Sequence, residues 1–463
     1  MLTSLSSAEI HDAYLQEFAR FEKNGAQPSP PWLFPLRKSG IAQFSEWGLP
    51  TIKDEDWRFT NLSAFKNQVY RVVTEDSRTH PDPDYIESLA MHELAGHRLV
   101  FVDGHYAPEL SDLAGLPDDL RVAPLADALR DHPDLLEEHL TRYSRESENA
   151  FGALNTALFQ DGLFIHVPRG VELTEPLLVI HLTLASESGK AVYPRSLVLL
   201  EAQSRLTLLE HHVTLGDAPA LVNAVTEIRL GQGAWCEHCK YQEQNSDSFH
   251  FSGLHTHLEA DSDFRTHSIV IGARLSRNDL RAKLAGKGAV GLLNGLYVPR
   301  DQQLMDHHMI VNHASSHCES HEYFNGILDD ASRGVFHGRI LVQPDAQKTD
   351  AKQTNKNLLL TDSATADTKP QLEIYADDVR CTHGATIGQL NPESIFYLRA
   401  RGIGLEMARR MLIHGFAEEI LDRIECRPAR EILNRLIWDR LEQRTESAAA
   451  IEFLEPVTDS TLV

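Results

Sequence analysis

The sequence predicts a mainly β protein with helical ends, from its length, the texture of its segments and the spacing of its turns. The chain has 463 residues, enough to bury a large core. Short apolar β runs broken by small turns fill its middle, whereas helical periodicity dominates before and after them. We therefore expect a helix-rich N-terminal region (1–150), a β core (151–390), a C-terminal helical subdomain (391–445) and a mobile tail (446–463).

The N-terminal region is predicted from helical spacing and from prolines. Apolar residues recur at helical spacing between Glu9 and Lys23, which predicts an amphipathic helix. The prolines from Pro28 to Pro35 predict an irregular connector. A short strand and turn is expected over 99–106, and a further helix over 131–148.

The β core contains turn-like positions at regular intervals. They centre near Gln203, Gln232, Ser262, Lys287 and Ser315, which lie 25 to 30 residues apart. This spacing favours a β-solenoid, in which each coil stacks on the previous one. An antiparallel sandwich also has frequent short strands, so the spacing alone leaves that architecture as an alternative.

The C-terminal region is predicted to contain three helices. Asn391 is a good N-cap, Pro392 suits the first helical position, and Gly402 ends this first helix. Two further helices are expected over 405–424 and 428–444, each with an apolar stripe. Their simplest role is a packed subdomain, and their alternative role is to dock a partner. Charged residues that could rim such a surface are Arg399, Arg401, Arg409, Arg410, Glu418 and Glu419.

Composition narrows the class of protein. The formal net charge is −23, from 44 basic and 67 acidic side chains, which argues against nucleic acid and anionic membranes as partners. No apolar run approaches the ~20 residues of a transmembrane helix, and the N-terminus does not read as a secretory signal. Five cysteines do not make a disulfide framework in a chain of this length. We expect a soluble, cytoplasmic protein with reduced thiols.

The segment 377–392 contains the most specific pattern. Cys381 and His383 lie two residues apart in a predicted strand, so their side chains project to the same face. A thiol and an imidazole on one face form half of a site for a soft or borderline metal. Two ligands are too few to close such a site, so a partner surface would have to complete it. The simpler interpretation is a buried thiol beside a hydrogen-bonded histidine.

Two other groups of potential ligands have simpler explanations. His307, His308, His313, His317, Cys318 and His321 crowd into one stretch, but strand geometry sends them to opposite faces. We expect hydrogen-bonded polar residues along successive turns. Cys236 and Cys239 form a lone CxxC without the second pair that a zinc ribbon needs, and are predicted to be two unconnected thiols.

With these residues in view, the chain resembles the SufB/SufD family of the SUF iron–sulfur assembly machinery. The resemblance is carried by the run 381–390, by 396–403, and by Asp56-Trp-Arg-Phe-Thr60, 151–157 and Asp306-His-His308. The run Cys-Thr-His-Gly-Ala-Thr-Ile-Gly-Gln-Leu is similar to the SufD branch in particular.

The resemblance implies a right-handed parallel β-helix core that pairs with SufB as a heterodimer. It implies that His383, and with less weight Cys381, serves a nascent cluster or iron site at the SufB contact. It also implies that the SufC ATPase, an ABC-type protein, binds the C-terminal helices. The isolated chain is then expected to hold no stable cofactor and to meet an iron–sulfur cluster or iron only transiently, in the complex.

Motifs that the chain lacks help to distinguish between the competing functions. The chain has no GxxxxGK[ST] phosphate loop, so it is expected to be non-enzymatic and not to hydrolyse ATP itself. The stretch 360–370 lacks the cysteine that SufB-type chains carry there, and Gly384 stands where they have glutamate. The main alternative is a SufB-like scaffold that assembles a cluster alone or as a homodimer. A solenoid enzyme that cleaves polysaccharides is disfavoured because that class is usually secreted, whereas this N-terminus does not resemble a secretory signal.

Overall fold

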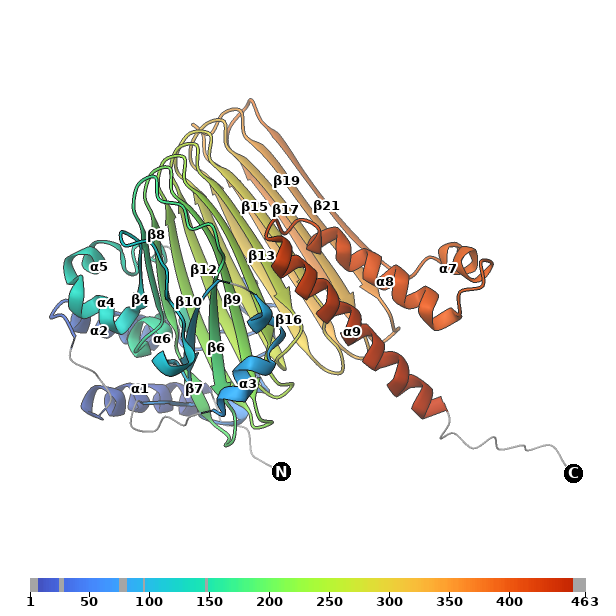
Figure 1. Cartoon of the computed structure of the whole chain (residues 1–463), viewed down its shortest axis with the longest axis horizontal. Coiled ribbons are helices and arrows are strands. Elements are labelled where there is room, and N and C mark those ends of the chain that lie inside the picture. Colours follow the sequence, from blue (N-terminus) through green and yellow to red (C-terminus); the bar gives the residue numbers. More distant parts are fainter. Residues whose placement is uncertain (1–6, 25–28, 75–80, 95, 146–148, 453–463) are drawn as a thin grey trace, which may run out of the picture.

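The computed structural model describes residues 7–24, 29–74, 81–94, 96–145 and 149–452. Its body is a long stack of strands arranged in two sheets, with helices from both ends of the chain packed against the outside (Figure 1). Consecutive strands of the stack alternate between the two sheets. From β8 onward, each strand therefore pairs with the strand two places along the chain.

Within the described residues, the first sheet has eleven strands in the order β20-β18-β16-β14-β12-β10-β8-β5-β4, with β7 paired to β10 and β1 paired to β7. Its strands are β1 (Arg71–Val72), β4 (Arg121–Pro124), β5 (Leu163–Val167), β7 (Lys190–Val192), β8 (Arg195–Leu200), β10 (Ala220–Leu230), β12 (Phe249–Leu258), β14 (Leu275–Leu284), β16 (Leu304–His313), β18 (Arg333–Val342) and β20 (Thr365–Ile374).

The second sheet has ten strands in the order β21-β19-β17-β15-β13-β11-β9-β6-β2-β3 over the same described part of the chain. Its strands are β2 (His97–Val102), β3 (His105–Tyr106), β6 (Leu177–Leu184), β9 (Arg205–Leu215), β11 (Trp235–Glu243), β13 (Asp263–Val270), β15 (Val290–Tyr297), β17 (Glu319–Leu328), β19 (Asp350–Leu359) and β21 (Arg380–Gly388).

The pairing pattern identifies a parallel β-solenoid. From β10 to β20 and from β9 to β21, neighbouring strands are parallel and in unbroken register. Antiparallel pairs occur at the N-terminal end, between β2 and β3 and between β4 and β5. The solenoid prediction is confirmed, and the antiparallel sandwich is excluded.

The turns between the two sheets form a ladder of their own. Gln203, Asp261 and His317 each adopt a left-handed backbone with φ of 57–60°. The N–H of Gln203 donates to the carbonyl of Gln232, and that of Asp261 to Lys287, both at 2.9 Å. These bonds satisfy backbone groups that a strand-to-strand corner would otherwise leave unpaired. The turns fall within about two residues of the predicted centres.

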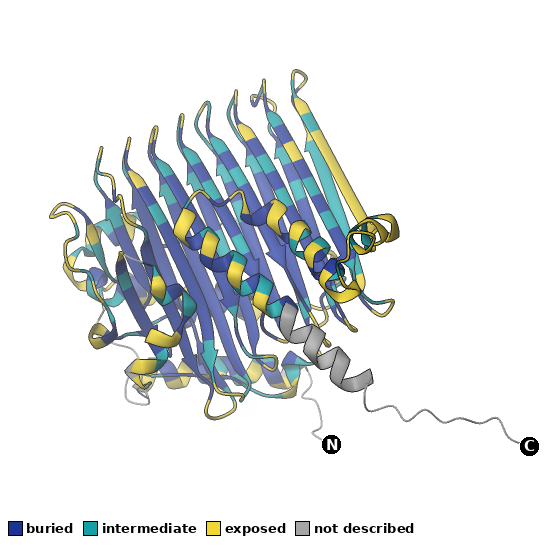
Figure 2. Cartoon of the chain, turned by 45° about the vertical axis from the view of Figure 1, so that its right-hand side comes forward, coloured by how far each residue is buried: buried dark blue, intermediate teal, exposed yellow. Residues whose placement is uncertain are grey.

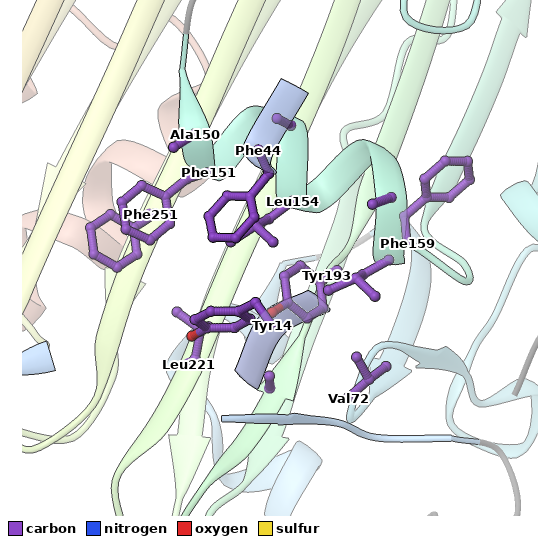
Figure 3. Packing of buried hydrophobic residues seen from close by; sticks show 14 of the residues in the cluster. Tyr14, Phe44, Val72, Ala150, Phe151, Leu154, Phe159, Tyr193, Leu221 and Phe251 are labelled. Atoms are coloured by element: carbon purple, nitrogen blue, oxygen red, sulfur yellow. The ribbon is translucent and has the colours of Figure 1, made fainter. Parts of the chain in front are cut away.

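Helices from the N-terminal region cover the outer face of the eleven-stranded sheet. They are α1 (Ser7–Asn24), α2 (Leu33–Trp47), α4 (Leu125–Asp131), α5 (Pro133–His139) and α6 (Ala150–Leu158), with the short 3-10 turns Glu55–Trp57 and Phe65–Asn67. Helix α3 (Pro83–Ser88) and the 3-10 turns Ala90–Glu93 and Pro108–Leu110 lie instead on the outer face of the ten-stranded sheet, where Ile86, Met91 and Leu110 join the buried cluster of that face. Aromatic packing fastens α6 to the sheet, because the rings of Phe151 and Phe251 stack with centroids 3.6 Å apart (Figure 3). Tyr14 of α1 and Phe44 of α2 belong to the same buried cluster.

Two N-terminal predictions need correction. Pro35 does not lie in an irregular connector but in the first turn of α2, where backbone N–H groups have no helical acceptor and proline is tolerated. The helix expected over 131–148 ends at His139. Beyond it the backbone N–H groups of Tyr143 and Ser144 turn to the carboxylate of Glu227, each at 2.9 Å, and this carboxylate also pairs with the buried guanidinium of Arg195.

The C-terminal helices are α7 (Pro392–Arg399), α8 (Leu405–Leu421) and α9 (Arg427–Glu452). Helices α8 and α9 pack on the outer face of the ten-stranded sheet, whereas α7 contacts α8 and buries none of its residues. The Asn391 side chain accepts the N–H of Glu393 at 2.8 Å, which confirms the predicted cap. Helix α9 continues to Glu452, beyond the predicted end, and residues 453–463 of the predicted tail lie outside the described residues. No helix of the described ranges has the length and apolar character that a bilayer crossing requires.

Candidate functional site

Strand β21 is the last rung of the ten-stranded sheet. It pairs with β19 on one side, in a register that sets Ala351 beside Cys381 and Gln353 beside His383. Ala351 and Gln353 are buried between the sheets, so Cys381 and His383 continue the inner face of the solenoid. The structure thus brings the two predicted site residues to one face of the terminal strand. Figure 2 shows that this strand, at the end where the stack stops, is mostly exposed.

The two side chains differ in exposure. Cys381 is half-buried and packs with Ile340, Val342 and Ala376. Burial, together with the charge of Asp350, raises the pKa of the Cys381 thiol, so the thiol is protonated at neutral pH in the free chain. His383 is exposed. A neutral imidazole that faces solvent can bind a metal without a large desolvation cost.

At this end of the solenoid, each of the two sheets has an unpaired edge strand. Strands β20 and β21 are the terminal strands of their sheets, so each has one side without a strand partner in this structure. Ile374, Tyr375 and Ile387 are large apolar side chains exposed there, Tyr375 by 62%. An edge with free backbone groups and apolar side chains is a template for another chain.

A buried polar ladder extends inward from His383. Gln353 lies next to His383 in register, and Glu322 of β17 lies next to Gln353. The Gln353 side-chain amide donates to the Glu322 carboxyl, and both residues are almost fully buried. Burial raises the pKa of Glu322 to about 7 although the Gln353 hydrogen bond opposes this shift. Sequence analysis did not single out this ladder. The sequence feature that could have revealed it is a polar residue, Glu322 and then Gln353, at strand positions whose side chains alternate onto the inner face.

The histidine-rich stretch does not form one site. His307 lies on the inner face, where burial lowers the pKa of its imidazole to about 3, and His313 bonds to the Ser320 hydroxyl at 2.8 Å. His308 points to the outer face of the eleven-stranded sheet, and His317 occupies a turn. The expected scattering over opposite faces is confirmed.

The CxxC pair is likewise split between two faces. Cys236 belongs to the cluster between the sheets, and Cys239 to the cluster beneath α8 and α9. Both are fully buried, and burial raises the pKa of each thiol. The prediction of two unconnected thiols is confirmed.

A second polar group that sequence analysis missed lies inside the solenoid. The ammonium of Lys240 donates to His250, Ser252 and Asn278 at 2.7–2.8 Å. Burial lowers the pKa of Lys240 to about 7. Nearby, Glu210 contacts His238 at 2.8 Å, so charged and polar groups satisfy one another within the core.

Helix α7 projects from the body of the molecule (Figure 1), and none of its residues is buried. Phe396 is 73% exposed and Tyr397 55% exposed. Among the predicted rim residues, Arg410 is instead buried, because its guanidinium stacks on Trp438 and donates to the Trp438 carbonyl. Helical periodicity could not reveal this contact between two helices.

Comparisons with known proteins agree with this architecture. A family model described as "SUF system FeS cluster assembly, SufBD core domain" matches residues 182–416, and one described as "SufBD protein N-terminal region" matches residues 8–179. The chain is 33% identical over 431 residues to an iron–sulfur cluster assembly protein SufD of Escherichia coli, covering 93% of this chain and 96% of the relative.

More distant relatives include both branches. A SufD of Bacillus subtilis is 25% identical over 91% of this chain and 96% of its own length. A SufB of the same organism is 24% identical over 89% of this chain and 90% of its own length. The chain therefore belongs to the SufB/SufD family of SUF iron–sulfur cluster assembly proteins, on its SufD branch.

Proposed function

We propose that this protein is a non-enzymatic component of the SUF assembly complex, which pairs with SufB through the open end of its solenoid and lends His383 to a nascent cluster. The cluster is the cargo of the complex and not a resident cofactor. The observation that best supports this proposal is the position of His383, exposed on the inner face of the terminal strand β21.

The chemistry of the open end favours a shared site over a closed one. His383 supplies one imidazole and Cys381 one thiol, and iron in a cluster needs more ligands than these two. The unpaired edges of β20 and β21 can accept strands of a partner, which would bring further ligands to the same face. SufB is the partner that the family resemblance implies.

A second surface has the exposed apolar side chains expected of a docking site for the SufC ATPase. Phe396 and Tyr397 on α7, with Leu405, Met407 and Met411 at the start of α8, are exposed apolar side chains on neighbouring helices. Aromatic and methionine side chains are enriched in protein interfaces. Nucleotide-driven movement of SufC could alter the SufB contact only if SufC binds two arrangements of the complex with different affinity.

The decisive experiment replaces His383 with Ala in the purified three-protein complex. We expect the complex to assemble normally and its iron and sulfide content to fall at least tenfold, because a ligand is lost without added bulk. Cys381→Ala should have a milder effect, since its thiol is protonated and half-buried.

The matched control is Thr382→Ala, which changes the residue between them on the opposite face of the same strand. Normal cluster loading by His383→Ala would refute the ligand role. A stable cluster formed by the isolated wild-type chain would instead favour the SufB-like scaffold.

A further inference from the structure

Three potential metal ligands meet on the outer face of the eleven-stranded sheet, away from His383. His308 of β16 and His337 of β18 are directly paired in register, and Asp56 of the 3-10 helix Glu55–Trp57 lies over them. The His308 Nε2 atom is 2.5 Å from His337 Nδ1 and 3.5 Å from Asp56 Oδ1. Both histidines are buried, whereas the Asp56 side chain is 53% exposed.

The outward nitrogen of each ring faces an acceptor. His337 Nε2 donates to Gln371 Oε1 at 2.7 Å, and His308 Nδ1 lies 3.6 Å from Asp279 Oδ1. The Gln371 oxygen accepts the bond from His337 Nε2, which leaves His337 Nδ1 as an acceptor, whereas the Asp279 carboxylate lies beyond hydrogen-bond distance of His308 Nδ1. His337 Nδ1, His308 Nε2 and the Asp56 carboxylate then face one another. A hydrogen-bonded proton or a metal ion can join these three groups.

The surroundings hold these groups in place. Arg277 is buried and donates to both Asp279 and Asp306, so the carboxylate behind His308 is fixed. The same guanidinium donates to the Asp56 backbone carbonyl at 2.7 Å and stacks on Trp57, which fixes the segment that carries Asp56. Ligands oriented by such supporting contacts are typical of built metal sites.

We propose that Asp56, His308 and His337 bind a divalent transition-metal ion. Two imidazole nitrogens and one carboxylate oxygen suit Zn²⁺ or Fe²⁺, whereas Mg²⁺ and Ca²⁺ prefer oxygen ligands alone. The bound ion joins the N-terminal segment to two adjacent turns of the solenoid. It therefore stabilises the packing of that segment, independently of the site at the open end.

The competing explanation is that a proton, shared in the hydrogen bond between His308 Nε2 and His337 Nδ1, occupies the place of the metal. The test uses the full-length chain carrying Cys381→Ala and His383→Ala, so that the open end cannot contribute ligands. The protein is stripped with a chelator and titrated with Zn²⁺, and separately with Fe²⁺ under anaerobic conditions, by calorimetry at pH 7.5. Thermal unfolding is followed with and without each ion.

We expect one equivalent of at least one of the two ions to bind, with a rise in the unfolding temperature. Asp56→Asn and His337→Gln should each weaken binding at least tenfold and abolish the rise. Asp56→Asn keeps the volume of a half-exposed side chain, so its fold is expected to persist. The control His321→Ala removes a histidine from the other sheet and should bind as before.

The visible spectrum of bound Co²⁺ reports metal binding independently of cluster assembly. Co²⁺ bound by nitrogen and oxygen should give visible d–d bands without thiolate charge-transfer absorption, and Asp56→Asn should weaken these bands. Absence of a bound equivalent, or equal binding by Asp56→Asn, His337→Gln and the parent, would overturn the proposal in favour of the shared proton.

Discussion

Glu322 shows how the fold sets the chemistry of a single residue. The side chain is fully buried on the inner face of β17 and accepts a hydrogen bond from the neutral amide of Gln353. Burial disfavours the charged form, and the pKa of Glu322 rises to about 7. Its unfolded pKa is about 4.3. The folded protein therefore binds more protons than the unfolded chain between these two values.

The sign of the pH dependence follows from this difference. Stability from Glu322 is fully present below about pH 4 and is lost as pH rises through about 7. The glutamine side chain of Glu322→Gln is neutral at both pH values. The free energy of unfolding of this variant, relative to that of wild type, should therefore rise by about 2–3 kcal/mol from pH 5 to pH 8. Denaturant unfolding at both pH values measures this gain.

A residue on the same strand gives the control. Glu319 is exposed at the start of β17, so Glu319→Gln makes the same chemical change without removing a buried carboxyl. Parallel pH curves for Glu322→Gln and wild type would show that the buried carboxyl is charged in the folded protein.

At the scale of elements, α7 differs from α8 and α9. Helices α8 and α9 bury Ile413, Ile420 and Leu433 in the cluster on the outer face of the ten-stranded sheet, whereas α7 buries nothing. Deletion of all three helices would uncover that sheet. Substitutions on α7 separate docking from folding more cleanly.

We expect Phe396→Ala and Tyr397→Ala to weaken SufC binding at least tenfold each while the unfolding temperature changes little, because surface substitutions alter stability by about 0.5 kcal/mol or less. Calorimetric titration with SufC and thermal unfolding measure the two effects. The aromatic control is Tyr375→Ala, which removes an equally exposed ring at the other surface. Unchanged affinity in both α7 variants would place the docking surface elsewhere.

The whole molecule is a stack in which stability depends on neighbours. Strand β10 is covered on both sides by β8 and β12, whereas β21 is paired by β19 alone. In such one-dimensional assemblies the terminal repeat opens first. The open end should therefore be the least protected part of the sheets.

Hydrogen exchange tests this gradient. In the free chain, amides of β21 should exchange at least tenfold faster than those of β10, and addition of SufB should slow β21 selectively. Amides of β11, deep in the stack, provide the internal reference. Equal protection of β10 and β21, or no change on addition of SufB, would contradict the proposed interface.

The sequence by itself determined the features that depend on local chemistry. Turn positions at regular intervals favoured the solenoid over the sandwich, and Asn391 with Pro392 predicted the start of α7. The two-residue period of a strand was enough to place Cys381 and His383 on one face, because neighbouring side chains must alternate.

Only the tertiary structure decided which face is inside and which residues distant in sequence meet there. Strand alternation assigns side chains to two faces but does not determine which face points into the solenoid. The stacking of turns sets the inner position of Glu322, Gln353 and His383. Asp56 lies beside His308 because aromatic packing and Arg277 bring the N-terminal segment onto the sheet. Such contacts arise from the packing of whole elements, and no local pattern in the chain encodes them.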